Sequence, residues 1–375
     1  MSSLSTWSET TLDEMRRIGD PPADGVIAAL TAAGQIDSAN RLMRDLVRND
    51  RLPPEDMPPL VREYFETTDD LPPWADPDKI RQGQEFFDRF GPQIAMVLNT
   101  YSLPTCYAAA KGVQVLYRTA QLYTNPKRRI IETTQMIIDV MQAGGLERGG
   151  YGVRAVQKVR LMHAGVRYLL QQHDWNPAWG VPINQEDLAG TLASFSAMVL
   201  DGLMKLGIDI SATERDAYVH AWNVVGHIMG VQAALIPEDF DQAVQLGQCV
   251  FGRQRGYTPE GEHLLMALIE CMQYATPGTL FDGFSITLIR FFMGNELSDE
   301  FHVPPNDWTR HVLRPLQLLF SLADDSGDIV RPIAKLSELF GRKLLEGYCF
   351  MERGGERPTF HIPTQLRQAW GIATA

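Results

Sequence analysis

Apolar residues recur at three- and four-residue spacing along most of the 375-residue chain, and this pattern limits the possible folds more than any other feature. Such spacing places apolar side chains on one face of an α-helix. The alternation typical of half-buried strands is missing at any useful length, and the best strand candidate is the short stretch 359–363. The sequence therefore predicts an all-α fold, with long helices over 78–100, 128–145, 154–173, 186–207, 214–235, 238–254, 259–276, 311–324 and 331–353.

Local signals mark where several of these helices begin and end. Ser211 is followed three residues later by Glu214, the spacing of a capping box, and Pro259 fits a first helical turn. Glycines at 144–145 and at 207 stand where helices are expected to end. These signals agree with the periodicity and support the same helical interpretation.

The first 75 residues differ from the rest of the chain in the length of their expected helices and in their proline content. Short helical pieces at 11–18, 38–48 and 57–67 are separated by proline-rich joints. We interpret residues 1–75 as an N-terminal wrapping segment and residues 76–375 as a single large helical domain.

Composition excludes several classes of protein. The net charge of −12 and the lack of any basic tract argue against nucleic acid as a partner. No window of about 18 apolar residues is free of charge, so no membrane span is expected. The N-terminus lacks a signal-peptide pattern, and the four cysteines are scattered without a C-x-x-C pair. We therefore expect a cytoplasmic protein.

One histidine stands between two arginines in the stretch QKVRLMHAGVR (157–167). Arg160, His163 and Arg167 share one broad helical face with apolar residues. The imidazole could coordinate haem iron while the arginines pair with propionate carboxylates. Alternatively, the histidine bonds a backbone group and the arginines extend outward. Spacing alone favours the second interpretation.

Glu132 and Thr133 are polar positions in the otherwise apolar helix expected over 128–145. They could face a reaction site. A local explanation is equally open, with Thr133 bonding back to the carbonyl of Arg129 and Glu132 pairing with Arg128, four residues earlier.

Two further histidines, His220 and His227, lie two helical turns apart. Such a pair is separated by about 10 Å along the axis, too far to chelate one ion. We expect the neighbouring Gly226 and Gly230 to allow close helix packing.

Four stretches in order carry a resemblance: LPTCYAAAKGVQVLYRT (103–119), RRIIETTQM (128–136), KVRLMHAGVR (158–167) and WNVVGHIMGV (222–231). Together they resemble the latex-clearing protein and mycophenolic-acid B type oxygenase family, over roughly residues 80–300. The arginine–x–x–histidine–x–x–x–arginine signature is the most specific part of the likeness.

The resemblance implies a globin-like all-α protein that binds haem b. It implies that His163 is the proximal iron ligand, supported by Arg160 and Arg167, which hold it or the propionates. Arg129 and Thr133 correspond to polar residues of the distal side, and Arg290 falls near another arginine of the family. We also expect the imidazole to donate its second N–H to a carbonyl or side chain.

This sequence departs from the rubber-cleaving members at two places. Segment 101–124 contains no acid where those members place a carboxylate, and Glu132 stands at the position of their distal lysine. Glu132 is therefore the candidate for the acid/base task, with Arg129 and Thr133 beside it.

The resemblance predicts a haem b-dependent oxygenase that uses O₂ on an intracellular apolar substrate, such as a prenyl, polyene or fatty acyl chain. Oxidative cleavage of a C=C bond to carbonyl products is the expected chemistry. The missing carboxylate leaves a non-catalytic haem- or lipid-binding protein as the alternative, and a haem-free member with a structural His163 as another.

Overall fold

The computed structural model describes residues 7–35, 58–122, 126–276, 283–305 and 330–353, together with residues 368 and 370. Across these residues the chain forms helices and no strand, which confirms the all-α prediction. Their one isolated β-bridge pairs Ala109 with Arg255. The expected elements at 38–48, 311–324 and 359–363 lie outside the described residues.

The helices in chain order are α1 (Glu9–Met15), α2 (Pro21–Ala32), α4 (Pro59–Thr67), α5 (Pro77–Val97), the π-helical turn η1 (Leu98–Ser102), α6 (Leu103–Tyr107), α7 (Val113–Leu122), α8 (Pro126–Met141), α9 (Tyr151–Gln171), the 3₁₀ turn η2 (Pro177–Trp179), α10 (Gln185–Phe195), α11 (Ala197–Lys205), α12 (Ala212–Ile228), the 3₁₀ turn η3 (Ala233–Leu235), α13 (Phe240–Gln254), α14 (Pro259–Ala275), α16 (Phe284–Met293), α17 (Asn295–Glu300) and α19 (Val330–Arg353).

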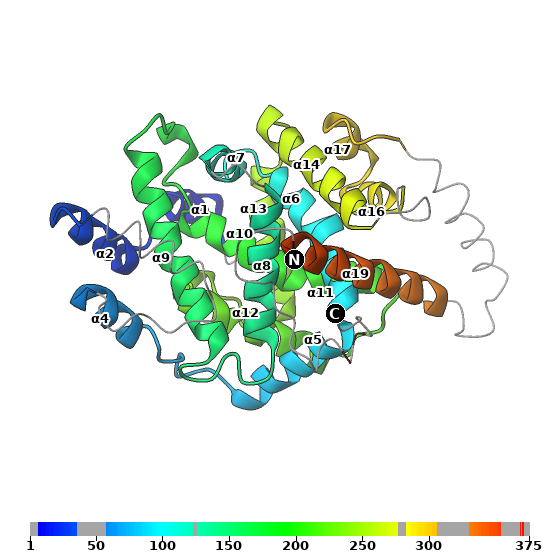
Figure 1. Ribbon diagram of the computed structural model, residues 1–375, viewed down its shortest axis with the longest axis horizontal. Helices are drawn as coiled ribbons and strands as arrows, with labels where there is room; N and C mark the ends of the chain where they lie inside the picture. Colours follow the sequence, from blue (N-terminus) through cyan, green and yellow to red (C-terminus); the bar gives the residue numbers. More distant parts are fainter. Residues whose placement is uncertain are drawn as a thin grey trace.

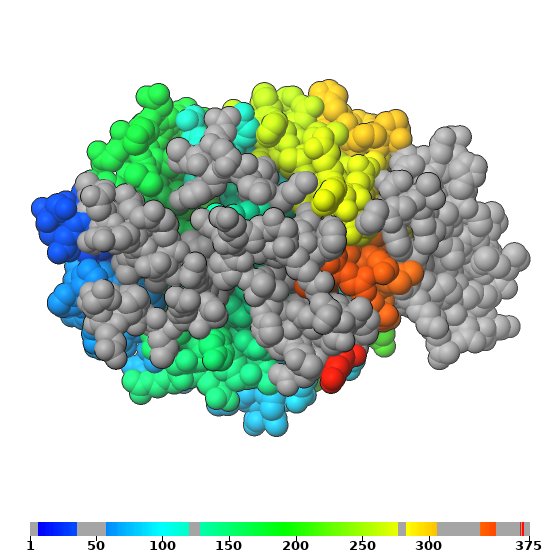
Figure 2. Space-filling model, in the orientation of Figure 1, coloured from blue at the N-terminus to red at the C-terminus, as the bar shows by residue number. Residues whose placement is uncertain are grey.

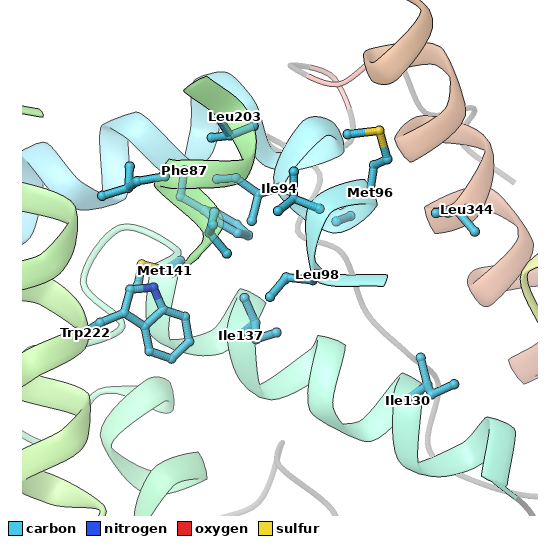
Figure 3. Close-up of a cluster of buried hydrophobic side chains, with 14 of the residues drawn as sticks. Phe87, Ile94, Met96, Leu98, Ile130, Ile137, Met141, Leu203, Trp222 and Leu344 are labelled. Atoms are coloured by element: carbon cyan, nitrogen blue, oxygen red, sulfur yellow. The ribbon is translucent and has the colours of Figure 1, made fainter. Parts of the chain in front are cut away.

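Helix α5 is the centre of the packing (Figure 1). It packs against α12 along one side and α19 along another, while α8 packs on α9 and α10 on α13. Apolar side chains from these helices form one large core, part of which Figure 3 shows. The labelled side chains there are Phe87, Ile94, Met96, Leu98, Ile130, Ile137, Met141, Leu203, Trp222 and Leu344.

The structure contains helix caps and ends at the positions that the sequence predicts. Ser211 and Glu214 form the reciprocal capping box at the start of α12. The Thr258 side chain accepts from the Gly261 N–H ahead of α14, with Pro259 in the first turn. Gly207 adopts φ 82° just beyond α11, a conformation that glycine reaches without steric cost.

Two of the expected helices differ from their predicted form. Segment 186–207 is two helices, because the backbone breaks at Ser196 with φ −104° and ψ −89°. Helix α5 continues into the π-helical turn η1, which brings Asn99 and Ser102 to the central cavity described below. Short π-helical turns of this kind occur frequently at functional sites.

The N-terminal helices pack on α9 and α10 through small apolar clusters of their own. Residues of α2 and α4 contact Leu161 and Ala164 of α9. Trp7 and Leu12 contact α10 and α13 instead. In the space-filling view α2 and α4 form one edge of the molecule (Figure 2). A boundary at residue 75 stays a prediction. Among the described helices, none has the length and apolar character that crossing a bilayer requires.

Candidate functional site

A cavity of about 370 Å³ lies between α5, α8, α9, α10 and α12. Most of its wall is apolar, which is typical of a small-molecule site. Four of the seven predicted site residues line it, namely His163, Arg129, Glu132 and Thr133. The structure therefore brings the histidine of α9 and the polar positions of α8 to one space.

His163 lines this cavity from the middle of α9. Its Nδ1 atom is buried and has no hydrogen-bond partner in the described part of the chain, so the expected bond to a carbonyl or side chain is not made there. Burial, together with the nearby Arg167 charge, lowers the pKa of His163 to about 3. The imidazole is therefore neutral at physiological pH, the form that coordinates a metal.

The polar residues of α8 are held by specific contacts. Arg128 Nε donates to Glu132 Oε1 at 2.6 Å, as the local explanation required, although Glu132 also lines the cavity. Arg129 Nη1 donates to the carbonyl of Leu116 at 3.0 Å. The bond back along the helix is made by Thr134 rather than by Thr133.

The two arginines beside His163 have other partners than a cofactor. Arg160 donates through Nε and Nη2 to both carboxylate oxygens of Asp20, at 2.6 and 2.7 Å. Arg167 Nε donates to Asp24 Oδ1 at 2.7 Å. Neither arginine lines the cavity. In this structure both therefore connect α9 to the N-terminal segment, and a role of either at the propionates stays a prediction.

Arg290, His220 and His227 also lie outside the cavity wall. Arg290 donates to the carbonyl of Val303 at 2.9 Å and pairs with Asp299 at 2.6 Å. His220 Nε2 accepts from the backbone N–H of Asp76 at 2.9 Å. These contacts tie helices and loops together.

The neighbouring glycines allow close packing, as expected. A Cβ atom at Gly226 would lie 2.6 Å from Leu192, and one at Gly230, which adopts φ 87°, would lie 2.7 Å from the Arg160 guanidinium. Gly230 therefore leaves the space in which the Arg160–Asp20 pair forms.

Two charged residues of the cavity wall were missed in the sequence. Lys158 is buried and lines the cavity from α9. Asp187 lines it from α10, where its Oδ1 accepts from Arg16 Nη1 at 2.9 Å. Burial raises the pKa of Asp187 against the opposing effect of Arg16. Lys158 stood in the stretch around His163 and could have been considered, whereas no sequence signal joined Asp187 to Arg16.

Comparison with known proteins shows the family of this chain. Residues 90–324, which include His163 and all of α8 and α9, match the model of the "ER-bound oxygenase mpaB/B'/Rubber oxygenase, catalytic domain" family. The chain belongs to this family. It therefore carries an oxygenase catalytic domain of the mpaB/rubber oxygenase type.

A curated relative and a solved structure agree with this membership. The chain is 29% identical over 314 residues to the rubber oxygenase of Streptomyces sp. (strain K30), which spans 79% of this chain and 75% of the relative. It also superposes on the latex clearing protein LCP in its closed state with a TM-score of 0.71. That match covers 87% of this chain and 90% of the other at 24% identity, and it shows a shared fold.

Proposed function

We propose that this mpaB/rubber oxygenase family member is a haem b-dependent oxygenase that uses O₂ to cleave a C=C bond of an apolar substrate. The observation that carries the proposal is His163, a neutral imidazole with an unpartnered, buried Nδ1 in the wall of an apolar cavity. A buried polar atom without a partner costs about 1–3 kcal/mol, and a group bound at the imidazole would offset this cost.

The donor set fits a haem better than a bare metal ion. Among the described residues no three His, Cys, Asp or Glu side chains gather as they would around a metal ion. A non-haem iron site takes two histidines and a carboxylate from the protein, whereas haem iron takes one axial histidine. His163 would supply that ligand. Haem, when bound, supplies the activation of O₂.

Arg160 and Arg167 act in this proposal by holding α9, because each already pairs with an aspartate. Lys158 lines the cavity from the same helix as His163, and in this proposal it is a candidate to pair with a haem carboxylate. Arg290 has no part in the proposed site, because its contacts are to Val303 and Asp299.

Glu132 is the proposed acid/base group, with Arg129 and Thr133 as polar neighbours. Its contact with Arg128 holds the carboxylate in place, and its position in the cavity wall gives it access to a substrate. A carboxylate there can take a proton from a substrate carbon and give it back before the two carbonyl products leave, so that the carbons keep all their hydrogens overall.

The apolar wall and the likeness to a rubber oxygenase both support an unsaturated hydrocarbon chain as the substrate class. Cleavage of an alkene by O₂ to two carbonyl groups places both oxygen atoms in the products. This reaction needs no external electron donor. The dry cavity keeps water away from the reacting carbons.

The absorption spectrum of purified protein tests the cofactor. We expect a Soret band that His163→Ala abolishes and that His227→Ala, a change at an exposed histidine away from the cavity, leaves intact. A folded protein that is colourless and binds no added haemin would contradict the proposal.

Oxygen consumption with polyenes and prenyl lipids tests turnover. We expect O₂ uptake matched by carbonyl products, and a Glu132→Gln variant that keeps the Soret band but loses most of its kcat. A haem-loaded protein that consumes no O₂ with any of these substrates would favour a carrier or sensor instead.

A further inference from the structure

A second cavity of about 310 Å³ adjoins the central one. It lies between α11, α13 and α16, and small apolar residues form much of its wall. Ala109 and Phe251 belong to the walls of both cavities. These two side chains therefore stand where the two cavities adjoin.

Most of the polar groups around the second cavity satisfy one another. Lys205 Nζ pairs with Asp201 at 2.6 Å and donates to the Tyr101 hydroxyl at 3.0 Å. The same hydroxyl donates to Asp201 at 2.9 Å. Lys205, Asp201 and Tyr101 therefore bond to one another, and the opposite charges of Lys205 and Asp201 cancel.

Arg255 is the remaining charged residue of this wall, and its side chain is exposed. Its guanidinium forms no ion pair or hydrogen bond with the described part of the chain. The second cavity thus carries one uncompensated positive charge, in a protein whose net charge is −12. A local charge of opposite sign to the whole molecule favours an anionic ligand.

The backbone around Arg255 is fixed at the junction between the cavities. Arg255 pairs with Ala109 in an antiparallel bridge. Ala110 N–H donates to the carbonyl of Gln254 at 2.8 Å, and Gly256 N–H donates to that of Ala108 at 2.9 Å. The bridge fixes the backbone of Arg255 beside Ala109, which belongs to the walls of both cavities.

We propose that the second cavity anchors the carboxylate of a long-chain unsaturated fatty acid on Arg255, while the acyl chain passes Ala109 and Phe251 into the central cavity. The guanidinium fork matches a carboxylate with two parallel hydrogen bonds. A prenyl diphosphate carries more charge than one free arginine can neutralise. The inference rests on the proposed function, because it names the substrate class of the same site.

Calorimetric titration of the purified protein with oleic acid and with methyl oleate tests the anchor. We expect the acid to bind more tightly than the ester, and Arg255→Gln to weaken the acid by up to about fivefold, because an exposed charge pair contributes at most about 1 kcal/mol. Arg255→Lys should recover part of the loss. Arg81→Gln, a change at an exposed arginine far from the cavity wall, is the matched control and should have no effect.

Chain length gives a second readout. Phe251→Trp enlarges the ring that stands between the two cavities, so it should weaken oleic acid far more than octanoic acid. Equal affinity for acid and ester, or an Arg255→Gln variant that binds oleic acid like the parent, would overturn the anchor. Tighter binding of geranylgeranyl diphosphate than of oleic acid would overturn the carboxylate class. These readouts do not use the iron, so a missing Soret band would refute the proposed function separately.

Discussion

Replacing Asp20 by Asn tests whether Arg160 serves the fold or a cofactor. The two side chains are only 3% and 10% exposed, and both carboxylate oxygens accept hydrogen bonds from the guanidinium. Arg160 also donates to the carbonyl of Ile228 at 3.0 Å, so it joins α9, α12 and the N-terminal segment. The amide keeps the shape of Asp20 but removes its charge and one acceptor. Asp20 itself lies outside the cavity wall.

The expected loss of stability follows from the burial of the Asp20–Arg160 ion pair. Removing one partner of a buried ion pair costs about 3–5 kcal/mol, because the other charge stays buried and uncompensated. The entropy of unfolding is about 2.1 cal/mol/K per residue, or roughly 0.8 kcal/mol/K for 375 residues. We therefore expect the Tm of Asp20→Asn to fall by about 4–6 °C.

The assay is thermal unfolding followed by circular dichroism, with the Soret absorbance recorded in parallel. Asp70→Asn is the matched control, because Asp70 and its partner Arg148 are 71% and 74% exposed. Exposed pairs contribute at most about 1 kcal/mol, so its Tm should change by about 1 °C or less. An Asp20→Asn protein with an unchanged Tm and a weakened Soret band would refute a structural role for the pair.

Four further predictions concern stability. Gly341→Ala should lower the free energy of unfolding by more than about 2 kcal/mol in a urea titration, because the new Cβ would lie 1.7 Å from the Pro92 carbonyl oxygen where α19 crosses α5. Gly25→Ala in α2 meets nothing within 4 Å and should instead stabilise by about 0.5–1 kcal/mol. Burial, with Glu85 nearby, raises the pKa of Asp88 from 3.8 to about 6, so the folded state binds a proton more readily than the unfolded chain. Stability should therefore fall as the pH rises from about 4 to 6, and Asp88→Asn should remove that part of the urea-midpoint profile. Ser211→Ala should cost about 1 kcal/mol through loss of the α12 cap, with no change in the Soret band.

Features fixed by neighbouring residues were predictable from the sequence. The capping box of Ser211 and Glu214 needs only a three-residue spacing, and the structure contains it. The break at Ser196 had no such signal, because no glycine or proline marks it and the apolar pattern runs through it. The π-helical turn η1 was also missed, because its residues, LNTYS, contain no glycine or proline that would mark it.

The sequence could predict those parts of the candidate site that depend only on which residues share one face of a helix. His163 and the polar positions Glu132 and Thr133 do line one cavity. The partners of Arg160 and Arg167 were not predictable, because Asp20 and Asp24 lie 140 and 143 residues away in the chain. Helical spacing shows which side chains share a face, but it does not show what the opposite surface carries.

The two ion pairs explain how His163 can keep its position without a hydrogen bond of its own. Arg160 and Arg167 are seven residues apart, two helical turns, with the histidine between them. Each pair connects α9 to a different carboxylate near the start of α2, and Arg167 also donates to the carbonyl of Ile183 at 2.9 Å. A helix held at two points that lie two turns apart can neither roll nor slide freely. The two ion pairs therefore fix where the backbone of α9 places His163 in the cavity wall, while its Nδ1 has no partner in the described part of the chain. On this reasoning, Asp20→Asn and Asp24→Asn together should broaden the Soret band before they remove it, whereas either change alone should mainly lower the Tm.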